Sequence, residues 1–213
     1  MYAFPKSKII PNTFTKEEIS KLKFDLYSRS PAKIKNNIMD FNLDYHLEDS
    51  VTFKIVKPKI DALFGNDHCF ASGCYKIAFR PYETHFDNQN FLNHSNVYSF
   101  SSTKQNEAAV LIPLVQGQYF NTVLFDVYSA EYHRMGKLLP SNFEQLNHND
   151  LNLQHFDHFD DELAKQQLTK LPLDKIYNWH LGDLVIWHRD QLHCSTNFQK
   201  FHLNKEFIIL FLA

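Results

Sequence analysis

The sequence contains few cysteines, no basic stripe and no long hydrophobic run, and each absence excludes a class of protein. Its three cysteines form no Cys-x-x-Cys pair, which favours a reduced intracellular protein over a disulfide framework. The formal net charge of −2 gives no indication of binding to nucleic-acid phosphates. The longest apolar runs, Ala108–Val115 and Phe207–Ala213, are too short to span a bilayer, and the N-terminus lacks the apolar core of a signal peptide. The sequence therefore predicts a soluble, cytoplasmic protein.

Aromatic residues are the abundant feature of the composition. The 213 residues include 20 Phe and 10 Tyr, with 44% hydrophobic and 22% charged residues overall. These proportions are those of an ordinary globular domain, and the length is sufficient for one well-filled core. Aromatic side chains favour sheets over helix bundles. We expect a single domain, 1–213, with a core built around β-sheet.

The first part of the chain carries helical signals. The segment Thr15–Glu18 has the Thr-x-x-Glu form of a capping box, and apolar residues at helical spacing follow it, which predicts a helix over about Lys16–Tyr27. A second helix is predicted over Val51–Phe64, kinked or interrupted at Pro58. Asn36–Leu47, between the two, is polar and irregular and is expected to be a loop. Residues 1–66 are thus predicted to be a helical support.

After Gly65 the hydrophobic period changes to that of strands. Residues 75–80 alternate between apolar and polar or small side chains, which predicts a strand leading directly into 80–87. Further strands are expected at Val97–Phe100, Ala108–Val115, Thr122–Tyr128, Trp179–Trp187 and Glu206–Leu212. The pattern loosens over about 130–175, which indicates an inserted loop or lid. Helices followed by about seven or eight strands predict a mainly β fold with flanking α, in which 67–213 form sheets and 1–66 support them.

The segment Arg80–Asp87 contains the strongest candidate site. If it runs as a strand, His85 and Asp87 lie two residues apart and leave the same face. One imidazole and one carboxylate are two of the three ligands of the 2-His-1-carboxylate triad that binds non-haem Fe(II). A downstream histidine must supply the third ligand. His193 and His188 are the two candidates, and His193 precedes the terminal apolar strand.

The His-x-Asp pair alone is weak evidence, because twelve histidines produce five such pairs. Three of them lie within 148–160, in a polar segment with no strand pattern, where solvated side chains are expected. The pair at 188–190 is followed too closely by the last candidate histidine, and no strand pattern continues beyond it until about 206. Only His85 and Asp87 follow an alternating strand and have a histidine downstream.

This arrangement resembles the 2-oxoglutarate- and Fe(II)-dependent oxygenases, and the prolyl-hydroxylase branch in particular. The resemblance covers roughly 68–213 and implies a double-stranded β-helix, or jelly roll. It implies metal ligation by His85, Asp87 and His193, with the ammonium of Lys205 binding the distal carboxylate of 2-oxoglutarate and Tyr75 helping to hold the same molecule. The sequence departs from the family in having lysine where many members have arginine, in its histidine-rich insert and in its few glycines.

The implied reaction uses Fe(II), 2-oxoglutarate and O₂ to hydroxylate a C–H bond, with release of succinate and CO₂. Because Asp87 is present rather than a small residue, hydroxylation is favoured over halogenation. The substrate would be a small molecule or an amino-acid residue, free or within a peptide. The candidates for its pocket are Tyr82, Arg80 and Trp187, although Arg80 equally suits a surface ion pair and Trp187 suits packing better than substrate contact. Likewise, Tyr75 remains open between core packing and cofactor contact.

Two other functions remain open. One alternative is a metal-binding cupin-like β-barrel that does not use 2-oxoglutarate; the absence of the paired His-x-His with a following Glu and framing glycines counts against it. A catalytically inactive relative that serves as a binding module would keep the fold and lose either the metal or the dependence on the keto acid.

Overall fold

The computed structural model describes residues 7–65, 70–82, 87, 108–128, 156–157, 166, 168–169 and 171–212. His85, the strand expected at Val97–Phe100 and most of the expected insert at 130–175 lie outside these residues. Within the described ranges, none of the helices combines the length and apolar character needed to cross a membrane.

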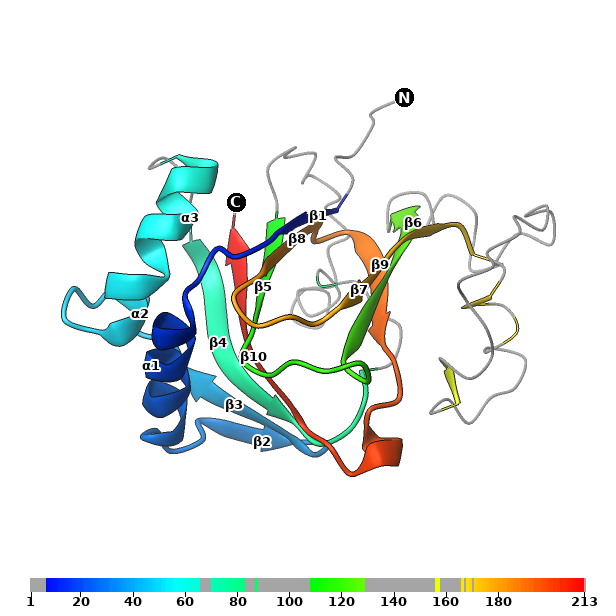
Figure 1. Cartoon of the computed structure of the whole chain (residues 1–213), viewed down its shortest axis with the longest axis horizontal. Helices are drawn as coiled ribbons and strands as arrows, with labels where there is room; N and C mark the ends of the chain where they lie inside the picture. Colours follow the sequence, from blue (N-terminus) through cyan, green and yellow to red (C-terminus); the bar gives the residue numbers. More distant parts are fainter. Residues whose placement is uncertain are drawn as a thin grey trace, which may run out of the picture.

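Two antiparallel sheets make up most of the described structure (Figure 1). The strands are β1 (Lys8–Ile10), β2 (Lys33–Lys35), β3 (Ile38–Asn42), β4 (Phe70–Ala78), β5 (Ala108–Pro113), β6 (Asn121–Tyr128), β7 (Leu173–Asn178), β8 (Leu184–His188), β9 (Gln191–Ser195) and β10 (Lys205–Leu212). The large sheet has the order β1-β8-β5-β10-β4-β3-β2, and the small sheet has the order β7-β6-β9. A mainly β fold is confirmed.

Three helices lie beside the large sheet, on the side away from the small sheet (Figure 1). They are α1 (Lys16–Tyr27), α2 (Val51–Ile55) and α3 (Lys57–Phe64). The predicted capping box of α1 is present, since the Thr15 side chain accepts from the Glu18 amide and the Glu18 side chain accepts from the Thr15 amide. The break between α2 and α3 falls at Val56, with Pro58 in the first turn of α3, where its missing N–H costs no hydrogen bond. Both helix predictions are confirmed.

The N-terminal region is more than a helical support, because it adds three strands to the large sheet. The loop predicted over Asn36–Leu47 is wrong, since Ile38–Asn42 forms β3 and pairs with β4. Asn36 and Asn37 join β2 to β3, and both have positive φ angles, of 50° and 59°. Asparagine tolerates this conformation, and two such residues make the two-residue hairpin turn that matches strand twist. The Asn-Asn pair is therefore the signal that could have predicted the hairpin.

The region around the distal histidine also differs from the prediction. The strand expected at Trp179–Trp187 is shorter, as β8 begins at Leu184, and β9 follows it after only Arg189 and Asp190. No alternating pattern marks β9 in the sequence, because polar residues such as Gln191 are buried in it. The Gln191 amide nitrogen donates to the Phe125 carbonyl oxygen at 3.0 Å, so this buried polar group is satisfied inside the fold.

Strand β10 lies between β5 and β4 and separates two cores. Ile208 and Leu210 belong to the core shared with the helices, whereas Phe207 and Ile209 belong to the core between the two sheets. This alternation is the two-residue period of a strand with both faces buried. Because Lys205 lies two residues before Phe207, its side chain leaves the strand on the side of the small sheet.

Candidate functional site

A cavity of about 170 Å³ lies between the two sheets. Its lining is largely aromatic and aliphatic, with a few polar side chains among them, the composition typical of small-molecule sites. The lining residues are Cys74, Lys76, Tyr82, Asp87, Leu111, Thr122, Trp179, Trp187, His193, Cys194, Ser195, Lys205, Phe207, Ile209 and Phe211. Three residues predicted from sequence to bind the metal or 2-oxoglutarate, Asp87, His193 and Lys205, therefore line one pocket.

His193 presents its Nε2 toward Asp87. Its Nδ1 lies 2.9 Å from the backbone oxygen of Gln191, and a carbonyl oxygen can only accept, so Nδ1 carries the hydrogen of the neutral ring. The lone pair is then on Nε2, which lies 3.6 Å from Oδ1 of Asp87. A backbone partner on the second nitrogen is the usual way in which a metal-binding histidine is oriented. Strand β9 thus holds His193 with its Nε2 directed toward Asp87.

Asp87 is held through its backbone and its side chain. Its amide donates to the Arg189 carbonyl oxygen at 3.1 Å, and its Oδ2 accepts from Trp187 Nε1 at 2.9 Å. Imidazole and carboxylate bind first-row metal ions at roughly 2.0–2.2 Å, so adjacent ligand atoms lie about 3 Å apart. The 3.6 Å between Asp87 Oδ1 and His193 Nε2 is close to this separation. The pair fits two ligands of one ion, and His85 as the third remains a prediction.

Lys205 places an ammonium in the same pocket. The residue is 1% exposed, and its Nζ donates to the Asn121 carbonyl oxygen at 2.6 Å and to Ser195 Oγ at 3.3 Å. Nζ also lies 4.3 Å from the centroid of the Trp179 ring, a favourable cation–π distance. In the described part of the chain no carboxylate pairs with it, and burial lowers the pKa of Lys205 to about 7. An anion bound here would restore the charge.

Two further residues that line the pocket, Thr122 and Ser195, carry hydroxyl groups, and sequence reasoning missed both. Thr122 Oγ1 accepts from the indole nitrogen of Trp179 at 2.9 Å, and Ser195 Oγ accepts from Lys205, so each hydroxyl hydrogen remains able to donate. One ammonium and two hydroxyls suit a carboxylate. Ser195 lies two residues after His193 in β9, and this spacing on one strand face was an available signal.

The predicted substrate residues divide into two groups. Tyr82 and Trp187 line the pocket, whereas Arg80 is not among its described lining residues. Lys76, which the sequence did not single out, lines the pocket and pairs with Asp40 at 2.7 Å. The rival ligand His188 is buried outside the lining, and its Nδ1 accepts from the Asp190 amide at 3.2 Å. Of the two candidate histidines, His193 is the one that lines the described pocket, and its role as a metal ligand stays a prediction.

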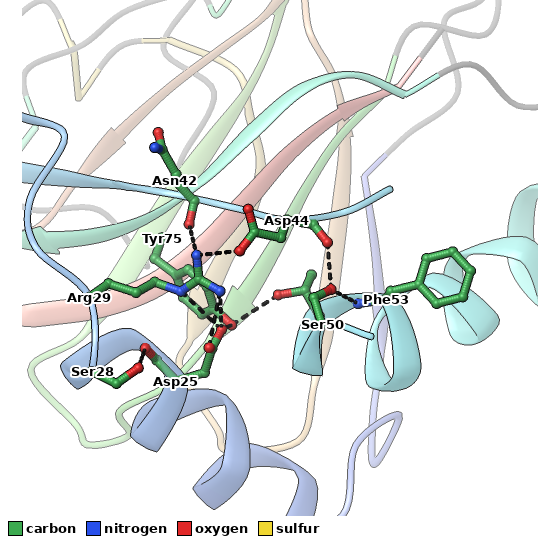
Figure 2. Close-up of polar contacts among 9 residues, drawn as sticks. Asp25, Ser28, Arg29, Asn42, Asp44, Ser50, Phe53 and Tyr75 are labelled. Carbon is green, nitrogen blue, oxygen red and sulfur yellow. Dashed lines mark hydrogen bonds and ion pairs between the residues drawn. The ribbon is translucent and has the colours of Figure 1, made fainter. Parts of the chain in front are cut away.

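Tyr75 is placed away from the pocket, contrary to its predicted contact with 2-oxoglutarate. It pairs with Ile208 across β4 and β10, and Ile208 lies three residues after Lys205, on the opposite face of the strand. Its hydroxyl donates to Asp25 Oδ2 at 2.7 Å (Figure 2). The same hydroxyl lies 3.1 Å from Thr52 Oγ1. Asp25 is also bound by the Arg29 guanidinium at 2.9 Å. Tyr75 therefore ties α1 and α2 to the large sheet.

Tyr75→Phe is expected to lower the free energy of unfolding by about 1–3 kcal/mol, because a buried hydrogen bond to a charged group is lost. Urea denaturation would measure this loss. Thr52→Val, which removes the other hydroxyl of the contact, should also destabilise the protein. Neither variant should change the affinity for 2-oxoglutarate. A weaker affinity in Tyr75→Phe at unchanged stability would restore Tyr75 to the site.

No family model matches the sequence, and no curated protein matches it. Solved structures do match the fold. They include SnoN, a non-haem α-ketoglutarate-dependent epimerase from nogalamycin biosynthesis, with a TM-score of 0.60 at 12% identity over 98% of this chain and 77% of that one. HygX from Streptomyces hygroscopicus, with nickel and 2-oxoglutarate bound, gives 0.58 at 10% identity over 98% and 82%. An oxidoreductase of the 2OG-Fe(II) oxygenase family from Burkholderia pseudomallei gives 0.54 at 10% identity over 98% and 84%. The chain has the fold of the 2-oxoglutarate- and Fe(II)-dependent oxygenases.

Proposed function

We propose that the protein is an Fe(II)- and 2-oxoglutarate-dependent oxygenase that hydroxylates a C–H bond of its substrate. The observation that carries this proposal is the shared pocket. A histidine and an aspartate face each other within it, and a buried ammonium without a described carboxylate partner lines the same cavity. In this proposal the two sheets are the walls of a double-stranded β-helix, and 7–65, which contribute three strands and three helices to the large-sheet side, belong to the same domain.

The residues present fit both cofactors. Asp87 and His193, with His85 from the segment outside the described residues, would hold Fe(II) and leave three positions open. Lys205, Thr122 and Ser195 would bind the distal carboxylate of 2-oxoglutarate. When bound, Fe(II) and 2-oxoglutarate would react with O₂ to supply the oxidant for the C–H bond, with 2-oxoglutarate converted to succinate and CO₂. The aromatic lining excludes water from the metal, which limits loss of the oxidant to side reactions.

A small-molecule substrate is the better supported class. Among proteins of this fold, HygX has been solved with hygromycin B bound and SnoN with nogalamycin RO bound. Tyr82 and Trp187 would contact the substrate, since both line the pocket that holds Asp87. A peptide residue as substrate remains the second possibility.

Anaerobic titration of the apo-protein with Fe(II) and 2-oxoglutarate tests the proposal. We expect a visible metal-to-ligand charge-transfer band that requires both additions, because the keto acid chelates the metal through two oxygens. Succinate, which lacks the 2-oxo group, is the control and should give no band. Fe(II) binding without any band would favour a metal-binding barrel of the cupin type. A band without turnover of any substrate would leave the inactive-relative alternative standing.

A further inference from the structure

Asp87 and His193 share one neighbour, the indole ring of Trp187. The indole Nε1 donates to Asp87 Oδ2 at 2.9 Å, and the ring centroid lies 5.0 Å from that of His193. Trp187 is 3% exposed and lines the pocket. A single side chain thus contacts both described candidates for metal ligation.

The end of β8 fixes this contact. Trp187 pairs with Ala109 of β5, a small residue that is fully buried, so the ring is held on the inner face of the large sheet. Two residues later, the Arg189 carbonyl oxygen accepts from the amide of Asp87. The backbone and the carboxylate of Asp87 are therefore both anchored to the same short stretch of chain.

An indole has one N–H and no acceptor, so it can bind only one carboxylate oxygen by hydrogen bonding. Here it binds Oδ2, while Oδ1 lies on the side of His193 Nε2. If the carboxylate rotated to offer both oxygens to a metal ion, it would occupy one of the positions that the keto acid and O₂ require. The hydrogen bond opposes that rotation.

We propose that Trp187 is a positioning residue, which holds Asp87 as a ligand through one oxygen and packs against the ring of His193. This inference rests on the proposed function and adds a role for a residue that sequence reasoning placed among substrate contacts. Partners that orient metal ligands typically contribute about 10- to 100-fold to metal affinity.

The experiment compares two indoles in one pocket. Trp187→Phe keeps an aromatic ring and removes the N–H, and we expect its affinity for Co(II) to fall about 10- to 100-fold in anaerobic titrations. Trp179→Phe is the matched control, since Trp179 is equally buried and its N–H binds Thr122 rather than a candidate ligand. Because the Trp179 ring lies beside Lys205 and its N–H binds Thr122, the control should retain the wild-type affinity for Co(II) when both titrations are made without 2-oxoglutarate.

A spectroscopic signature separates positioning from a merely structural role. The Co(II) d–d spectrum depends on coordination number, so Trp187→Phe should change its shape at saturating metal, whereas Trp179→Phe should not. A second measurement avoids altering Trp187. The chain has two tryptophans, and Trp179→Phe identifies their indole N–H signals by NMR. Asp87→Ala should then shift the Trp187 signal and leave that of Trp179 in place.

Each outcome decides the inference. Unchanged Co(II) affinity and spectrum in Trp187→Phe, or an unmoved Trp187 signal in Asp87→Ala, would overturn the positioning role while leaving wild-type metal and keto-acid binding intact. Absence of Co(II) binding to the wild-type protein would instead overturn the proposed function, and the positioning role with it. If Trp187→Phe does not fold, the NMR measurement on Asp87→Ala is sufficient: a shifted Trp187 indole signal supports the positioning role, and an unmoved signal overturns it.

Discussion

His193→Ala is expected to lower the affinity for Fe(II) more than about 100-fold, because removing a ligand costs more than removing a partner that merely orients one. The charge-transfer band should disappear together with the metal. The expectation follows from the position of Nε2, 3.6 Å from Asp87 Oδ1, with Nδ1 bound to the Gln191 carbonyl oxygen. Metal titration at fixed 2-oxoglutarate would measure it.

His188→Ala provides a matched control. His188 is as buried as His193 and lies five residues earlier, but it does not line the pocket and packs edge-on against Tyr128. Its substitution should cost stability and leave metal affinity per folded molecule unchanged. Loss of the metal in His188→Ala with retention in His193→Ala would mean that the ligand had been assigned to the wrong histidine.

The sequence predicted the elements whose local signals were unambiguous. The capping box and spacing of α1, the proline at the start of α3 and the continuous apolar run of β10 each matched the structure. Strand β9 escaped prediction because Gln191 and Ser195 are polar, and only tertiary contacts with Phe125 and Lys205 reveal why they are buried. Polarity along one strand cannot distinguish a solvated side chain from one that is satisfied inside the fold.

The sequence indicated which residue types form the candidate site more reliably than it indicated which face of a strand each side chain leaves. Asp87, His193 and Lys205 meet in one pocket, although the strand expected to carry Asp87 ends earlier, at Ala78. Tyr75 carries a hydroxyl that could bind a carboxylate, but its side chain leaves the wrong face of the sheet. It lies opposite Ile208 and not opposite a residue of β10 that faces the pocket. The face that a side chain leaves depends on strand register, which is set by partner strands distant in sequence.

Lys205→Met is expected to raise the concentration of 2-oxoglutarate needed for half-saturation by about 10- to 150-fold, with Fe(II) affinity retained. The magnitude is that of one hydrogen bond to a charged group, about 1.5–3 kcal/mol. Methionine fills the space of the lysine stem without its charge, so the change tests the ammonium and not the packing. Titration of the charge-transfer band with 2-oxoglutarate would measure the effect.

The control for this change is Lys23 of α1, which contacts β10 at Glu206. Lys23 Nζ is 3.0 Å from Glu206 Oε2, and Glu206 follows Lys205 in β10. Lys23→Met removes a positive charge that lies beside Glu206 and outside the pocket. The affinity for 2-oxoglutarate should therefore not change. Equal effects of the two substitutions would indicate a general electrostatic influence and would remove Lys205 from the cofactor site.

The pH dependence of binding distinguishes a titrating ammonium from a permanent cation. Burial lowers the pKa of Lys205 to about 7, below its value of about 10.5 in the unfolded chain. Between these values the unfolded chain binds more protons, so this residue makes the apo-protein more stable as pH rises through that window. Over the same window the affinity for 2-oxoglutarate should fall by about tenfold per pH unit, since the anion requires the charged lysine. In Lys205→Arg the guanidinium stays protonated, so the affinity of this variant for 2-oxoglutarate should not change with pH above pH 7. A slope in the arginine variant equal to that of the wild type would trace the pH dependence to another group.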